Sequence, residues 1–84
     1  MIDSKTGNRI VVEIDEKFGP YITVTTFQDA GALEDIFDDQ LFIVYWSDTP
    51  DECKVGGGNR YYFGGIADPE KLQNILDNLK FSFV

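Results

Sequence analysis

Residues 29–46 read Asp-Ala-Gly-Ala-Leu-Glu-Asp-Ile-Phe-Asp-Asp-Gln-Leu-Phe-Ile-Val-Tyr-Trp, a helical pattern followed directly by a strand pattern. Leu33, Ile36 and Phe37 recur at the i, i+3, i+4 spacing that places apolar side chains on one helix face. Residues 41–46 are apolar at every position, which predicts a central strand covered on much of both faces. The stretch therefore predicts a helix that packs on a sheet.

Two segments rich in β-branched residues, 9–14 and 21–27, precede this stretch. The connector between them contains Gly19 and Pro20, so the pair predicts a β-hairpin. Thr26, with Asp29 three residues later, has the spacing of a capping box in which Asp replaces the preferred Glu. This pair predicts the start of the first helix.

The second helix has the clearest local signals. Asp68 is predicted as its N-cap and Pro69 as its first residue. Apolar residues then recur at helical spacing: Leu72, Ile75, Leu76 and Leu79. Residues 61–67 before it and the alternating residues 81–84 after it are predicted as strands.

Together these elements predict one small α+β domain spanning residues 1–84, in the order β-β-α-β-β-α-β. We expect a mainly antiparallel five-stranded sheet with the two helices packed on one face. One cysteine rules out an intramolecular disulfide, and a small domain without disulfides is typical of the cytoplasm. No apolar run approaches membrane-spanning length.

A shift of 39 residues aligns the two predicted helices, through duplication or because both obey the same physics. At matched positions the first helix carries carboxylates where the second carries amides of nearly the same shape: Glu34 against Gln73, Asp35 against Asn74, and Asp39 against Asn78. The comparison indicates that this kind of helix does not need those charges.

The acidity is concentrated in one part of the chain. The net charge is −8, and no Lys or Arg occurs from residue 18 to residue 53. That span holds eight of the fifteen acidic residues, whereas the remaining seven balance the seven basic ones. Three interpretations stay open: a solvated face that aids solubility, a docking surface for a basic partner, and a metal site. Such a charge argues against direct binding of nucleic acid or of an anionic membrane.

Common catalytic constellations are missing from the sequence. The chain has no histidine, which removes Ser-His-Asp and Cys-His catalysis. Cys53 beside Lys54 is a lone thiol, expected to be ordinary and partly exposed, and residues 56–58 (Gly-Gly-Gly) fit no phosphate-loop pattern, so they are expected to form a flexible loop tip. Asp48, Asp51 and Glu52 do not follow the calcium-loop spacing. We expect no enzyme activity and no cofactor.

Aromatic side chains lie on two strands that are expected to pair, at Tyr45, Trp46, Tyr61, Tyr62 and Phe63. Alternation sends about half of them away from the helices. Those side chains would form an aromatic patch on the open sheet face, as protein-binding surfaces do.

The favoured function is therefore non-catalytic binding to a basic protein partner, by a monomer or a homodimer. Its stronger form is an inhibitor that occupies a nucleic-acid-binding groove, a profile shared by the class of bacterial immunity and phage anti-defence proteins. The alternatives are an assembly subunit that dimerises through the aromatic face, and a small-molecule or divalent-cation binder. The predicted partner-binding residues are Glu34, Asp35, Asp38, Asp39, Asp48, Asp51, Glu52, Trp46 and Tyr62.

Overall fold

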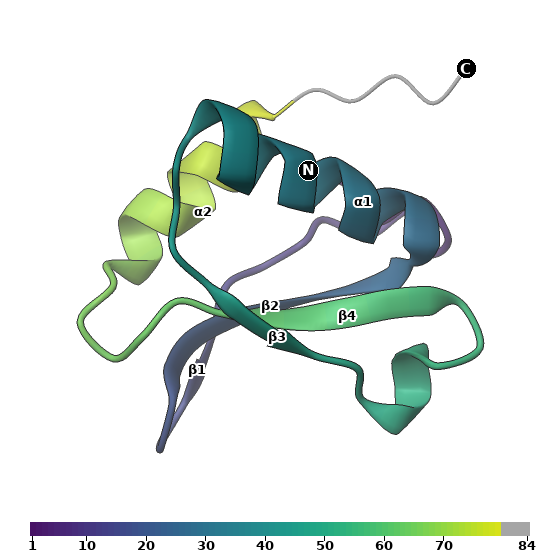
Figure 1. Ribbon diagram of the computed structural model, residues 1–84, viewed down its shortest axis with the longest axis horizontal. Coiled ribbons are helices and arrows are strands. Elements are labelled where there is room, and N and C mark those ends of the chain that lie inside the picture. The colour runs from purple at the N-terminus through teal and green to yellow at the C-terminus, as the bar shows by residue number, and fades with distance from the viewer. Residues whose placement is uncertain (80–84) are drawn as a thin grey trace.

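A computed structural model describes residues 1–79 of the chain (Figure 1). Two helices lie on one side of a four-stranded antiparallel sheet, in which the strand order is β1-β2-β4-β3. The elements are β1 (Glu13–Asp15), β2 (Gly19–Thr26), α1 (Phe27–Asp35), the π-helical turn η1 (Ile36–Gln40), β3 (Trp46–Asp48), the 3₁₀ turn η2 (Asp51–Cys53), β4 (Gly57–Tyr62) and α2 (Pro69–Asn78). The α+β class is confirmed, and the predicted strand over residues 81–84 lies outside the described residues.

The predicted hairpin is present as β1 and β2, with Ile14 opposite Pro20. Gly19 has a φ of +81°, and a Cβ there would lie 2.7 Å from the Cα of Gly65, so this turn requires glycine. Pairing starts only at Glu13, later than predicted, because the preceding chain turns to α2. There the N–H of Val12 donates to Oε1 of Gln73 at 2.8 Å.

The prediction of a central strand over residues 41–46 is wrong. Only Trp46–Asp48 pairs, as β3 at the edge of the sheet, and the central strands are β2 and β4. The reason is that the first helix continues through η1, so the chain must descend from the helix layer before it reaches the sheet. Phe42 begins this descent with a φ of +53°.

The segment of three glycines is also different from the prediction. Residues 57–58 begin β4 and pack tightly against β2, and a Cβ on Gly58 would overlap the carbonyl oxygen of Val24. These glycines therefore permit close strand approach instead of forming a loose loop tip. As a consequence β4 covers residues 57–62, whereas a strand over 61–67 was predicted.

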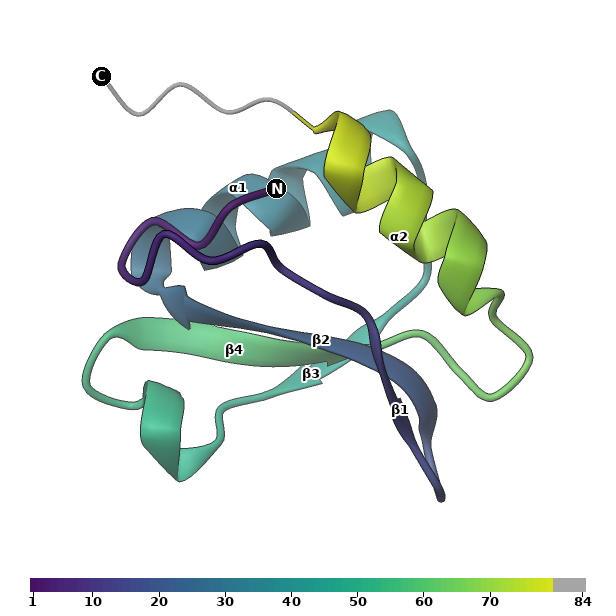
Figure 2. The same cartoon turned by 180° about the vertical axis from the view of Figure 1, so that it is seen from behind.

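The core lies between the sheet and the helices. It is built from buried side chains of β2, β4, α1, η1 and α2: Ile22, Val24, Tyr61, Leu33, Phe37 and Leu76. The N-terminal segment contacts both helices (Figure 2), since the terminal amine donates to the carbonyl of Leu76 and the N–H of Ser4 donates to Asp29. At the start of α2, Oδ1 of Asp68 accepts from the N–H of Glu70 at 2.9 Å, as the predicted cap requires.

Candidate partner-binding surfaces

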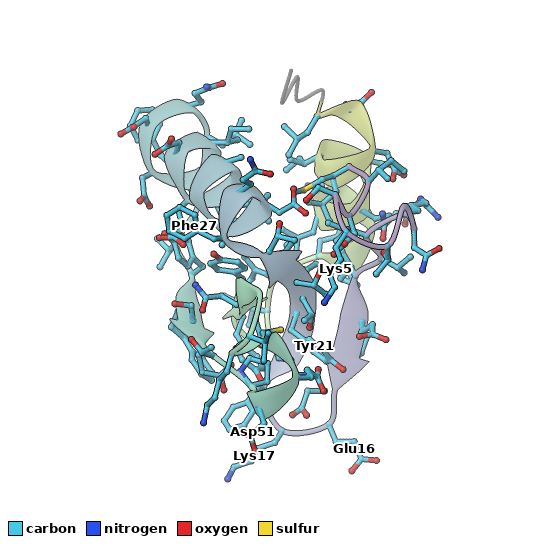
Figure 3. The ribbon with its side chains drawn as sticks, turned by 90° about the vertical axis from the view of Figure 1, so that its right-hand side faces the viewer. Lys5, Glu16, Lys17, Tyr21, Phe27 and Asp51 are labelled. Atoms are coloured by element: carbon cyan, nitrogen blue, oxygen red, sulfur yellow. The ribbon has the colours of Figure 1, made fainter. Side chains whose placement is uncertain are left out.

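The sheet divides the acidic stretch into two groups. Both α1 and η1 lie on the helix side, while η2 lies on the opposite side (Figure 1). Figure 3 shows the same separation, with Phe27 of α1 well above Asp51 of η2, which lies near the bottom. We call Glu34, Asp35, Asp38 and Asp39 the helix group, and Asp48, Asp51 and Glu52 the loop group.

Asp29, the remaining acid of the stretch, is fully buried. Its N–H donates to Oγ1 of Thr26 at 3.2 Å, so one half of the predicted capping box forms. Its carboxylate accepts from the N–H of Ser4 at 2.8 Å, and so it ties the N-terminal segment to the first turn of α1. Asp29 is a structural residue that no partner can reach.

A tyrosine hydroxyl holds each of two carboxylates in the helix group. The hydroxyl of Tyr61 donates to Oε2 of Glu34 at 2.7 Å, and that of Tyr45 donates to Oδ2 of Asp38 at 3.3 Å. Burial, and then the nearby Asp38 charge, raise the pKa of Tyr45 to about 12. Tyr45 therefore keeps its proton near neutral pH and remains a donor to Asp38.

The other two members of the helix group, Asp35 and Asp39, are exposed. Among residues 1–79, no Lys or Arg forms an ion pair with any of the four helix-group carboxylates. Their negative charge is therefore not compensated by a direct basic partner in the described part of the chain.

The loop group is different, because two of its three carboxylates have basic partners. Asp51 pairs with Lys54 at 2.8 Å, and Glu52 pairs with Arg60 at 3.0 Å. Asp48 is directly across β3 and β4 from Arg60 in the strand register. Within the acidic stretch, the group in which no carboxylate has an ion pair among residues 1–79 is therefore the helix group on α1 and η1.

On the sheet face opposite the helices, Trp46 and Tyr62 meet as alternation predicts. Their rings stack with centroids 4.1 Å apart and an interplanar angle of 11°. Phe18 packs edge-on against both, at 5.3 Å from Trp46 and 5.6 Å from Tyr62. Tyr62 is consequently only 6% exposed, whereas Trp46 is 45% exposed. The accessible rings of this face are therefore Trp46 and Phe18, which the sequence analysis missed, whereas Tyr62 is covered.

A second feature that the sequence analysis missed is the exposed segment before β3. Phe42 and Val44 are 78% and 87% exposed, respectively. This segment lines an open groove of about 460 Å³, together with Phe37 and Asp38. The sequence carries no signal for this exposure, because residues 41–46 are apolar at every position.

Possible metal ligands and the single thiol lie within the described residues. No group of three or more Cys, Asp or Glu side chains within residues 1–79 is arranged to hold a metal ion. Contrary to the expected partial exposure, Cys53 is buried, and its Sγ lies 3.5 Å from the carbonyl oxygen of Val24. Burial, and then the charge of Glu52, raise the pKa of this thiol, which keeps it protonated and unreactive.

No helix in the described part of the chain has the length and apolarity to cross a membrane. No protein-family description, no curated protein and no solved structure matches this chain.

Proposed function

We propose that this chain is a non-catalytic protein-binding module that docks the acidic outer face of α1 and η1 onto a basic surface of a partner protein. The observation that carries the proposal is the uneven compensation of charge. The loop-group carboxylates Asp51 and Glu52 have basic partners, whereas no carboxylate of the helix group has one among residues 1–79. Like charges this close on one helix repel each other, at a cost of a few tenths of a kcal/mol per pair.

The second helix supports this proposal because α2 has amides at the matched positions. Asn74 and Asn78 correspond to Asp35 and Asp39, and α2 folds with its cap in place. Charge at these positions is therefore not required by the helix itself. Docking gives the negative charge at these positions a role, since an electric field of one sign accelerates association with an oppositely charged partner.

In its stronger form, the proposal is that the module inhibits a partner by occupying a groove that otherwise receives phosphates. Carboxylates on one helix face can present negative charges to the Lys and Arg side chains of such a groove. Dissociation of the complex would then be strongly promoted by salt, because exposed ion pairs are screened beyond a Debye length of about 8 Å at physiological ionic strength.

The test compares two triple variants of equal charge change. The first is Glu34→Gln, Asp35→Asn and Asp39→Asn. Its matched control changes three exposed glutamates elsewhere to glutamine, at residues 13, 16 and 70. With a partner captured from the native host, calorimetry in 50 and 500 mM NaCl gives the affinity of each variant.

We expect the first triple variant to lose about 10- to 100-fold in affinity, if each lost pair is worth about 0.5–1 kcal/mol. The control should stay within about threefold of the unchanged chain. Folding should survive in both, since a glutamine at position 34 still offers an oxygen to the hydroxyl of Tyr61. Equal losses in the two variants, or an affinity that hardly changes with salt, would refute the proposal.

The exposed rings of Phe18 and Trp46 favour a second candidate, an assembly subunit that dimerises through the face opposite the helices. Light scattering of the pure protein tests it. A dimer that persists in high salt and is lost in Trp46→Ser would support dimerisation through aromatic contacts, whereas a monomer would remove this candidate.

A further inference from the structure

We infer that the outer sheet edge at β3, together with the segment that precedes it, accepts an extended segment of the partner as an additional strand. The incoming strand is expected to alternate apolar and basic side chains. This inference rests on the proposed function, because it names the part of a basic partner that would dock and the place where it would lie.

Strand β3 lies at one edge of the sheet. It pairs with β4 on one side, in the register Trp46 opposite Tyr62, and it is the last strand of the order β1-β2-β4-β3. An edge strand presents unpaired N–H and C=O groups on its outer side. Residues 43–45, which lead into it, are not part of any strand ladder in the described chain, and of their backbone donors the N–H of Ile43 is bound to the carbonyl of Phe37.

Exposed and half-buried side chains alternate along residues 42–46. Phe42, Val44 and Trp46 are exposed, and they alternate with residues that turn toward the core. Ile43 and Tyr45 pack against that core. After the left-handed turn at Phe42, this alternation is that of a strand with one face packed on the core and the other exposed, and residues 43–45 have no strand beside them in the described part of the chain. Adjacent strands bring such side chains into cross-strand pairs, so the exposed row would meet alternate apolar residues of an added strand.

Negative charge lies on the helix side of this edge. Asp38 lines the groove above residues 42–45 and accepts a hydrogen bond from Tyr45. Side chains of an added strand that point toward the helix layer would therefore approach Asp38 and Asp39 of η1. Lys or Arg at those positions would supply the missing opposite charge.

The same charges disfavour a second copy of this chain as the occupant. No Lys or Arg occurs between residues 18 and 53, so pairing with the same edge of another copy would place carboxylates such as Asp38 and Asp48 close to carboxylates of that copy, and they would repel each other. No lysine or proline within residues 41–48 blocks the edge, although natural edge strands often carry one for protection. A partner with a basic strand fits the edge better than self-association does.

The test uses an acetylated, amidated heptapeptide in which Lys and Val alternate, as a probe of stated chemistry. One control peptide has the same composition, with the four Lys and three Val residues in blocks. A second control is the alternating peptide N-methylated at every other residue, which removes the backbone donors on one side. Titration of the full ¹⁵N-labelled chain gives both the affinity and the residues affected.

We expect the alternating peptide to shift the signals of residues 42–48 and to bind at least tenfold more tightly than either control. Two variants with almost equally exposed rings, Phe42→Asn and Phe27→Asn, separate this edge from general apolar contact, because the rings are 78% and 76% exposed. Phe42→Asn should weaken binding at least fivefold, and Phe27→Asn should leave it unchanged. Thermal melts of both variants verify that they are folded.

Several outcomes would overturn the inference. Shifts confined to α1 and η1, with no preference for the alternating peptide, would leave the proposed function intact but remove the added strand. Self-association through residues 42–48, or contacts of residues 81–84 with this edge in the free protein, would show that the edge already has another occupant. Absence of binding by all three peptides would also contradict it.

Discussion

Phe42 provides a direct test of the backbone at the end of the first helix. It has a φ of +53°, in the left-handed region that bulky side chains rarely adopt. The two flanking residues close the helix end, since the N–H of Leu41 donates to Ile36 and that of Ile43 donates to Phe37, both at 2.9 Å. Phe42 therefore occupies a position at which helices normally place Gly or Asn. We predict that Phe42→Asn stabilises the protein.

The magnitude follows from two opposing terms. Left-handed backbone costs an ordinary L-residue about 1–2 kcal/mol, most of which Asn avoids. The ring of Phe42 is 78% exposed, so only about a fifth of its surface is buried. With about 3 kcal/mol for full burial, the loss of that contact costs roughly 0.6 kcal/mol. The expected net gain is about 0.5–1 kcal/mol in the free energy of unfolding.

Urea unfolding monitored by Trp46 fluorescence measures this gain, and thermal unfolding gives a second readout. A gain of this size should raise Tm by roughly 2–8 °C in a domain of this length. Phe27→Asn is the control, because it removes an equally exposed ring where the backbone is not left-handed, and it should bring no gain. A decrease of more than about 1 kcal/mol in the free energy of unfolding of Phe42→Asn would refute the reasoning, because the ring would then stabilise the fold more than its exposure and its φ angle imply.

Three further predictions concern the interior and the pH dependence. Arg9 and Asp77 form a pair at 2.6 Å, and the hydrogen bond from Arg9 lowers the pKa of Asp77 to about 2. The pair therefore stabilises the fold fully above about pH 4, and its contribution is lost as the pH falls to about 2. Urea titrations should show that the difference in free energy of unfolding between the unchanged chain and Arg9→Gln disappears over that range. Tyr61→Phe removes a buried hydroxyl that donates to Glu34, and it should lower the free energy of unfolding by about 1–2 kcal/mol. An unchanged free energy of unfolding would contradict this prediction. The buried thiol of Cys53 should react with a disulfide reagent only as fast as the protein opens, and rapid labelling in native buffer would show that it is accessible.

Local signals in the sequence predicted the features that depend on neighbouring residues. The Asp68 cap, the Pro69 start and the apolar spacing of α2 act within one or two helical turns, and the structure contains all three. The β1–β2 hairpin was predicted for the same reason, since its turn lies within the predicted connector. The absence of histidine and the position of the acidic stretch are properties of the sequence that folding cannot change.

Only the tertiary structure decided which strand is central and which charges remain uncompensated. An apolar run such as residues 41–46 has no local feature that distinguishes a buried strand from an exposed descent toward an edge, because strand pairing depends on residues far along the chain. In the same way, Arg60 reaches Glu52 through the β3–β4 region, and Ser4 from the N-terminus covers Asp29. One acidic stretch of sequence therefore became a buried residue, a partly neutralised loop and an uncompensated helix face.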